Sequence, residues 1–70
     1  MVRGMETRSV REIPGWQVVR LLKRRGVRQQ DVAQRAGTSG GTVSQAIHRS
    51  PKVSKGLAER IWTAIEEALR

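Results

Sequence analysis

Ala33, Gly37 and Val43 have the spacing of a helix-turn-helix, and this spacing constrains the fold more than any other feature of the chain. Two short helices can cross at roughly 90–120° when the first presents a small side chain at the crossing and the link turns sharply. Ala33 fits the crossing, Gly37 fits the turn, and Val43 places an apolar group between the helices. Four further apolar residues have the i, i+3, i+4 spacing of inward-facing positions: Val32, Ala36, Ala46 and Ile47. Residues 29–48 are therefore predicted to form two helices packed across a tight turn.

The length and composition indicate one small domain without a metal or cofactor site. Seventy residues are near the size at which a single core is only marginally stabilising, so dimerisation or a bound partner would help to hold the fold. The chain has no cysteine, which excludes disulfides and cysteine-based zinc sites and fits a reducing cytoplasm. Its single histidine cannot form a metal cluster, and we expect no cofactor.

The sequence contains neither a membrane segment nor a catalytic constellation. The longest apolar run is two residues, which excludes a transmembrane helix and the apolar part of a secretory signal. We find no nucleophile beside a base, no carboxylate pair and no phosphate-binding loop. The protein is therefore expected to be cytoplasmic, free of membrane contact and not an enzyme.

Four helices and no strand are predicted after a short N-terminal arm. Residues 1–13 lack a helical period and mix arginines with glutamates, which predicts a flexible basic arm. The folded domain is predicted over residues 14–70, with helices at about 14–25, 29–36, 40–49 and 55–70. Gly26 and Gly37 fit the left-handed stops of the first two helices. Ser39 and Ser54 fit the N-caps of the last two, which gives an all-α, compact four-helix domain.

Positive charge is concentrated in the middle of the chain. The net charge of +8 divides into +1 over residues 1–19, +8 over residues 20–55 and −1 over residues 56–70. The cations of the middle segment form what we call the basic block: Arg20, Lys23, Arg24, Arg25, Arg28, Arg35, Arg49, Lys52 and Lys55. Asp31 is the one acid in that segment. A basic stripe confined to a helix-turn-helix and its flanks is typical of a protein that sits on a polyanion, whereas a charge run alone fits a solvated surface.

The two tryptophans, Trp16 and Trp62, lie on apolar helix faces outside the motif. Core or dimer contacts are expected there rather than base stacking. Proteins that bind single strands usually expose their aromatic side chains, so this placement disfavours that class. In the last helix Trp62 and Leu69 lie beside the core stripe, which predicts the dimer contact on that helix.

Part of the motif reads Asp31-Val-Ala-Gln-Arg-Ala-Gly-Thr-Ser-Gly-Gly-Thr-Val-Ser. This run, continued through His48 and Val53-Ser54, resembles the DNA-binding headpiece of the lactose repressor family over about residues 31–69. The added helix before the motif resembles the lambda-type phage repressors, the Cro proteins and the Ner regulators. These resemblances imply a lambda repressor-like fold and a small transcriptional regulator of the repressor kind, which binds double-stranded DNA as a homodimer. No ligand-binding core follows, so no small-molecule ligand is implied.

The resemblance also implies how particular residues meet DNA. In these families the second helix of the motif, here about residues 40–49, enters the major groove while the helix before it crosses the backbone. Ser39 and Thr42 match positions that contact phosphate. Gln45 matches a base-reading position, and glutamine can pair with adenine through N6 and N7.

The expected interface extends to both sides of this helix. The flanking cations are expected to neutralise phosphates: Arg28, Arg49, Lys52 and Lys55. Gln29 begins a helix whose free N–H groups can meet a phosphate. Gly40 and Gly41 lie where relatives carry large reading side chains, so little direct reading is expected from them. The full set of expected DNA contacts is Arg28, Gln29, Ser39, Gly40, Gly41, Thr42, Ser44, Gln45, His48, Arg49, Lys52 and Lys55. For Gln45, His48 and the flanking cations the alternative is an ordinary solvated residue.

An interaction protein is the second function class that fits the sequence. An antitoxin-like or partner-binding helical domain would present the same basic face to an acidic protein. DNA binding should weaken steeply with salt and prefer an operator over random duplex, whereas partner binding should persist without duplex.

Overall fold

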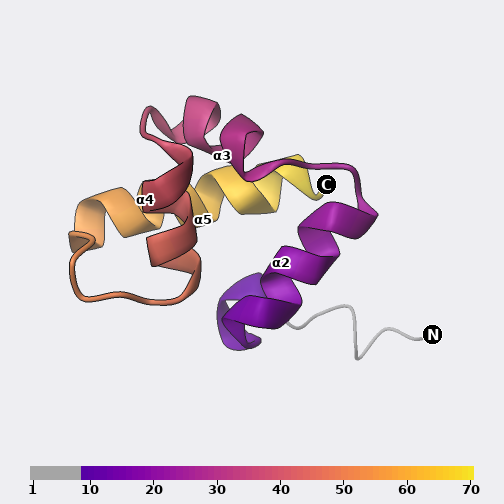
Figure 1. Ribbon diagram of the computed structural model, residues 1–70, viewed down its shortest axis with the longest axis horizontal. Coiled ribbons are helices and arrows are strands. Elements are labelled where there is room, and N and C mark those ends of the chain that lie inside the picture. Colours follow the sequence, from indigo (N-terminus) through magenta and orange to yellow (C-terminus); the bar gives the residue numbers. More distant parts are fainter. Residues whose placement is uncertain (1–8) are drawn as a thin grey trace.

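Four α-helices and one short 3-10 turn make up the part of the chain that the computed structural model describes, residues 9–70. The elements in chain order are η1 (Val10–Glu12), α2 (Gly15–Arg24), α3 (Gln29–Ala36), α4 (Gly40–Ile47) and α5 (Lys55–Ala68). Helices α3 and α4 both pack on α5, and α2 joins them through the end of α4 (Figure 1). No strand occurs within residues 9–70, so the predicted all-α, four-helix fold is confirmed. None of the helices in this range combines the length and apolar character needed to cross a bilayer.

Helix α2 ends where the sequence predicts a left-handed glycine. Gly26 has φ +72°. Its N–H donates to the carbonyl of Lys23 at 3.1 Å, and the N–H of Val27 donates to the carbonyl of Leu22 at 2.9 Å. These two hydrogen bonds satisfy backbone carbonyls that the end of a helix would otherwise leave without a partner. At the other end Pro14 is the N-cap, so the helix is one residue shorter at each end than predicted.

The turn between α3 and α4 has the geometry that the motif requires. Gly37 lies in the left-handed region at φ +75° and lets the chain reverse. Ser39 then caps α4, because its Oγ accepts the N–H of Thr42 at 3.3 Å. The far end of α4 differs from the prediction, since the helix stops at Ile47 and not at Arg49. Arg49 is itself left-handed, with φ +57°, and a helix cannot continue through that conformation.

The core forms where the two motif helices meet α5. Val43 is fully buried between α3 and α4, and Ala33 is 1 % exposed, which confirms the packing predicted from their spacing. Among the described residues the buried core comprises Val18, Leu22, Val32, Ala33, Ala36, Val43, Ala46, Ile47, Ile61, Trp62, Ala64 and Ile65. Leu21 was expected in the buried stripe of α2 and is half-buried.

The two tryptophans lie in different environments, and Trp62 is less exposed than the dimer prediction requires. Trp62 is 7 % exposed and belongs to the core, and Leu69 is half-buried against that core. The exposed apolar surface on which the predicted dimer contact of α5 was based is therefore buried at Trp62 and half-buried at Leu69 within one chain. Trp16 lies on the outer side of α2 and is 60 % exposed.

Residues 9–13, the end of the predicted arm, are packed against the domain. Val10 and Ile13 contact the hydrophobic core, and Ser9 caps the 3-10 turn by accepting the N–H of Arg11. The prediction of a flexible arm is therefore wrong for these five residues, whose two apolar side chains find partners far away in the sequence. Residues 1–8, the rest of that prediction, lie outside the described range.

Candidate nucleic-acid interface

Helix α4 turns one polar face outward. Val43, Ala46 and Ile47 are buried, and Gln45 and His48 are exposed on the opposite side. The predicted contacts Thr42 and Ser44 are half-buried at the edges of this face, which carries no acidic side chain: the helix reads Gly-Gly-Thr-Val-Ser-Gln-Ala-Ile. We call the exposed side of α4 and its cap, formed by Ser39, Gly40, Gly41, Thr42, Ser44, Gln45 and His48, the polar face. Its hydrogen-bonding side chains and lack of acids fit a groove lined by hydrogen-bonding groups.

The first turn of this helix holds two linked hydroxyls. The Oγ of Ser39 lies 3.0 Å from the Oγ1 of Thr42 and also accepts the N–H of Thr42. Each hydroxyl has one hydrogen, so one donates to the other and one O–H remains available to an outside acceptor. The pair therefore offers one hydroxyl donor at the N-terminus of α4, where the helix dipole also favours an anion.

Gly40 and Gly41 have no packing role within the chain. A β-carbon added to Gly41 would meet nothing within 4 Å, and one added to Gly40 would meet only Oε1 of Gln30 at 3.5 Å, an ordinary contact. Neither residue has a positive φ. The packing of the described residues therefore does not require glycine at either position.

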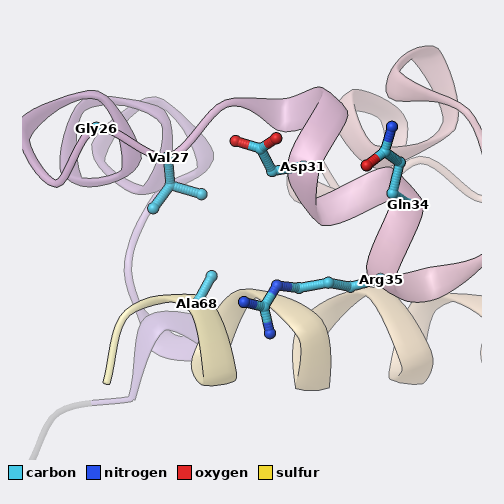
Figure 2. A pocket seen from close by; sticks show the side chains of 6 residues that line it. All are labelled: Gly26, Val27, Asp31, Gln34, Arg35 and Ala68. Atoms are coloured by element: carbon cyan, nitrogen blue, oxygen red, sulfur yellow. The ribbon is translucent and has the colours of Figure 1, made fainter.

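The start of α3 presents an exposed cation beside an acid with a structural role. Arg28 is exposed at the N-cap, and its backbone N–H donates to Oδ2 of Asp31 at 3.1 Å. This bond commits the carboxylate of Asp31 to capping α3. On the flank of α3, Asp31, Gln34 and Arg35 border an open hollow of about 430 Å³, where Figure 2 shows the Arg35 side chain reaching along α5 toward Ala68.

The flanking cations fall into two groups. Lys52 lies exposed in the loop after α4, Lys55 lies exposed at the first position of α5, and neither forms an ion pair within residues 9–70. Arg49 differs, because its guanidinium donates to three backbone carbonyls of the same chain. Among the described residues the structure therefore leaves Arg28, Lys52 and Lys55 free of ion pairs around the motif, whereas the guanidinium of the exposed Arg49 is bonded to backbone carbonyls.

The ion pairs of the described residues all belong to Arg11. Its Nη1 lies 2.7 Å from Oε2 of Glu59, and its Nε lies 3.0 Å from Oε2 of Glu66. The hydrogen bonds to Glu59 and then Glu66 raise the pKa of Arg11 above its ordinary value. Two of the three acids of α5, Glu59 and Glu66, are thus paired with Arg11 and not with the basic block.

Three residues support this site without a signal in the sequence. A β-carbon on Gly15 would lie 2.9 Å from the carbonyl oxygen of Ile47, so the start of α2 touches the end of α4. Arg60 donates to the carbonyl of Ala36 at 2.8 Å and holds the end of α3. Arg11 pins the N-terminal segment to α5. All three act over long sequence separations, which periodicity does not report.

No group of three or more His, Cys, Asp and Glu side chains in the described region is placed to hold a metal ion.

A family model described as bacterial regulatory proteins, lacI family, matches residues 29–68, which is more than half of the chain. The chain belongs to the lacI family. The match covers α3, the turn, α4 and α5, so it covers the complete helix-turn-helix and the helix on which it packs. This lacI-family domain is a DNA-binding domain of transcription regulators, and its family binds double-stranded DNA. No curated protein and no solved structure matches the chain.

Proposed function

We propose that the protein is a transcriptional repressor that binds one preferred duplex DNA sequence as a homodimer, with α4 in the major groove. The observation that carries the proposal is the polar face of α4, which has no acid and begins with two glycines that the fold itself does not require. Without side chains at Gly40 and Gly41 the start of the helix can approach DNA closely. Base-edge contacts are then concentrated on few residues.

In the proposed complex Gln45 is the main reader of sequence. It is exposed near the middle of α4, and its amide can pair with N6 and N7 of an adenine. Gly40 and Gly41 contribute shape recognition instead of base-specific hydrogen bonds. The preference among sequences is therefore modest and is carried by few base pairs.

Phosphate contacts fix the position of the helix on either side of the groove. On one side we place the Ser39–Thr42 hydroxyl pair, Arg28 and the N-terminus of α3 at Gln29. On the other side we place Lys52 and Lys55 after α4, with His48 as a further donor. These contacts add affinity without reading sequence.

The homodimer places two copies of α4 on an inverted repeat. One small domain offers one recognition helix, and a two-fold dimer doubles the contacts on half-sites about 34 Å apart, or a multiple of that. Trp62 is buried within one chain and offers little surface to this dimer. A complex of one chain with one half-site at full affinity would contradict the dimer.

The test is a selection of bound sequences from random duplexes, followed by affinity measurements on the selected site. We expect Gln45→Ala to weaken that site by about 1–3 kcal/mol and to relax the preference at one position. Gln34→Ala is the matched control, because Gln34 is an exposed glutamine on α3 beside the hollow, and it should leave both quantities unchanged. Unchanged preference after Gln45→Ala would contradict the reader, and binding to acidic protein but to no duplex would contradict the repressor.

A further inference from the structure

The backbone and side chain of Arg49 show that the structure holds this residue in place. Arg49 is the single non-glycine residue with positive φ in the described part of the chain. Its Nη1 donates to the carbonyl of Ile47 at 3.0 Å, and its Nη2 donates to the carbonyls of Arg11 and Ile13, both at 2.9 Å. The guanidinium carbon also lies 5.1 Å from the centre of the Trp62 ring, within cation–π range. A residue keeps an unfavourable backbone conformation only when contacts with the surrounding structure hold it there, as these contacts do for Arg49.

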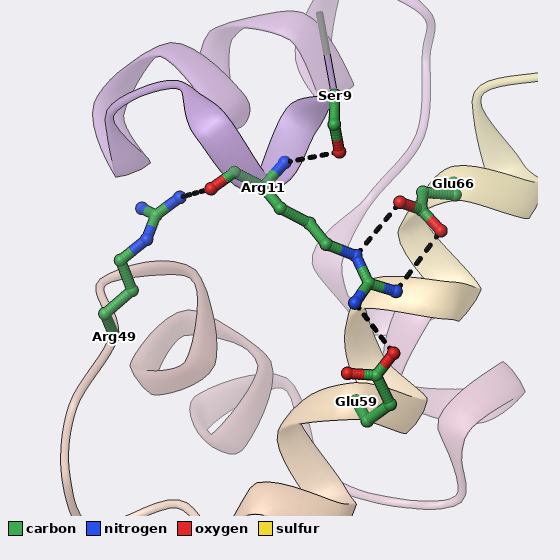
Figure 3. Close-up of polar contacts among 5 residues, drawn as sticks. All are labelled: Ser9, Arg11, Arg49, Glu59 and Glu66. Carbon is green, nitrogen blue, oxygen red and sulfur yellow. Dashed lines mark hydrogen bonds and ion pairs between the residues drawn. The ribbon is translucent and has the colours of Figure 1, made fainter.

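A second arginine anchors the segment that Arg49 contacts. Arg11 reaches from η1 to α5, where its Nη1 bonds to Glu59 and its Nε and Nη2 bond to the two oxygens of Glu66 (Figure 3). The bidentate contact with Glu66 fixes the direction of the guanidinium as well as its position. The contacts therefore run from α5 through Arg11 to the backbone of residues 11–13, and from there through Arg49 to the end of α4. We call residues 9–13 with these two arginine contacts the brace.

We propose that Arg49 is a positioning residue for α4 and not a phosphate ligand, and that the brace is the means by which α5 sets the end of the DNA-reading helix. The inference rests on the proposed function, since it assigns the brace to DNA reading. Residues 9–13 of the brace precede the matched lacI-family region, which begins at residue 29, whereas their partners Arg49, Glu59 and Glu66 lie inside it. Residues 9–13 are thus an addition to the helix-turn-helix, and their sequence shows no helical period. Gly15 adds a separate contact with the same end of α4, because a β-carbon there would lie 2.9 Å from the carbonyl oxygen of Ile47 and from Nδ1 of His48.

The first experiment compares Arg49→Lys and Arg49→Gln with Lys52→Gln as the phosphate-type control. A lysine keeps the charge but has no planar fork, so it cannot reach the carbonyl of Ile47 through one nitrogen and those of Arg11 and Ile13 through another. We expect both Arg49 variants to lose at least about tenfold in the affinity ratio between the selected site and random duplex, with an unchanged salt slope. Lys52→Gln should leave the ratio unchanged and make the salt slope shallower by about 0.9 for each protomer bound. The proposal is overturned if Arg49→Lys behaves as the wild type while Arg49→Gln shows the slope change of Lys52→Gln.

The second experiment tests the brace in the free, full-length protein by amide hydrogen exchange. The reporters are the N–H groups of His48, Arg49 and Ser50, which donate to the carbonyls of Ser44, Ala46 and Gln45. We expect Arg11→Gln to accelerate their exchange about tenfold or more, and to leave the Thr38 N–H at the end of α3 unchanged. Arg25→Gln is the control, because Arg25 also donates to a carbonyl, that of Leu69, at 2.8 Å but does not touch η1.

The two experiments separate the brace from the proposed function. If no duplex sequence is preferred, the proposed function fails, and exchange at the end of α4 still decides whether the brace holds that helix. If Arg11→Gln leaves the three reporters unchanged, the brace is overturned whatever the DNA affinity. A double-mutant cycle between Arg11→Gln and Arg49→Gln should be non-additive in the exchange rates, and strict additivity would also overturn the proposal.

Discussion

Gly37 is the residue on which the geometry of the motif most directly depends. Its φ of +75° is unfavourable for any residue with a β-carbon, and such a carbon would also lie 3.0 Å from Nη2 of Arg60. We expect Gly37→Val to lower the free energy of unfolding by about 1–3 kcal/mol, from backbone strain and from disturbance of the Arg60 bond to Ala36. Denaturant unfolding measures the change. Gly37→Asn is the control and should cost less, because asparagine tolerates the left-handed region.

A matched pair of glycines tests whether DNA requires close approach at α4. Gly41 and Gly56 are each the second residue of a helix, and a β-carbon on either would meet nothing within 4 Å. Alanine at each position should therefore stabilise the protein equally, by up to about 1 kcal/mol. Only Gly41→Ala should weaken DNA binding, because only Gly41 lies on the polar face. Equal DNA affinities for the two variants, measured by titration, would mean that the glycines of α4 are merely tolerated.

The structural role of a residue could be predicted from the sequence where it depends on neighbours within a few positions along the chain. Ala33, Gly37 and Val43 were predicted correctly because side-chain size and backbone freedom act within one turn of helix. Arg49 was predicted to contact phosphate because it flanks the motif, a prediction that DNA-binding measurements have still to test. Its bonds to the carbonyls of residues 11 and 13 span more than 35 positions. No local pattern contains that information. The close approach at Gly15 was missed for the same reason.

At the scale of elements, two N-caps of similar geometry allow stability and binding to be separated. The Oγ of Ser39 caps α4 through the N–H of Thr42, and the Oγ of Ser54 caps α5 through the N–H of Leu57, both at 3.3 Å. We expect Ser39→Ala and Ser54→Ala each to lower the free energy of unfolding by about 1 kcal/mol. Thermal or denaturant unfolding checks this expectation.

DNA affinity should distinguish the two caps. Ser39→Ala removes a hydroxyl of the pair that we place on phosphate and should weaken all sequences about equally, whereas Ser54→Ala should not weaken any once the protein is folded. Loss of sequence preference in Ser39→Ala would assign this serine to base reading instead. Equal affinities for both variants would remove the hydroxyl pair from the interface.

The helices were predicted to within one or two residues at most ends because their caps and stops are short-range signals. The element η1 was not predicted, because a 3-10 turn of three residues is too short to show a helical period in the sequence. Its place is fixed by Val10 and Ile13 in the core and by Arg11 on α5, contacts that exist only after the chain has folded. Helix α4 ends early for a related reason, since the brace holds Arg49 outside the helix.

At the scale of the whole molecule, the distribution of charge separates a structural region from a binding region. Glu59 and Glu66 of α5 are paired with Arg11, which leaves the net charge of +8 concentrated in the basic block. Two free copies of the chain therefore repel each other at low salt. Duplex DNA removes that repulsion, so the proposed homodimer should assemble on DNA. Sedimentation of the free protein should give a monomer, and the complex on an inverted repeat should contain two chains; one chain per repeat would contradict the dimer.

The salt dependence of binding follows from the same distribution of charge. If Arg28, Lys52 and Lys55 of each protomer neutralise phosphates, a dimer releases counterions from about six of them, and the plot of log affinity against log salt has a slope of about −5. Affinity should then fall about 10³-fold between 50 and 200 mM salt.

Two variants with the same loss of charge test which cations account for that slope. Lys55→Gln should make it shallower by about 1.8, because each of the two protomers loses one phosphate contact. Arg35→Gln also removes one charge, but Arg35 lies over the hollow beside α5 and should leave the slope unchanged. An equal effect of both variants would mean that the total charge and not its placement governs binding. A wild-type slope near −2.7 would instead correspond to three contacts and a single bound chain.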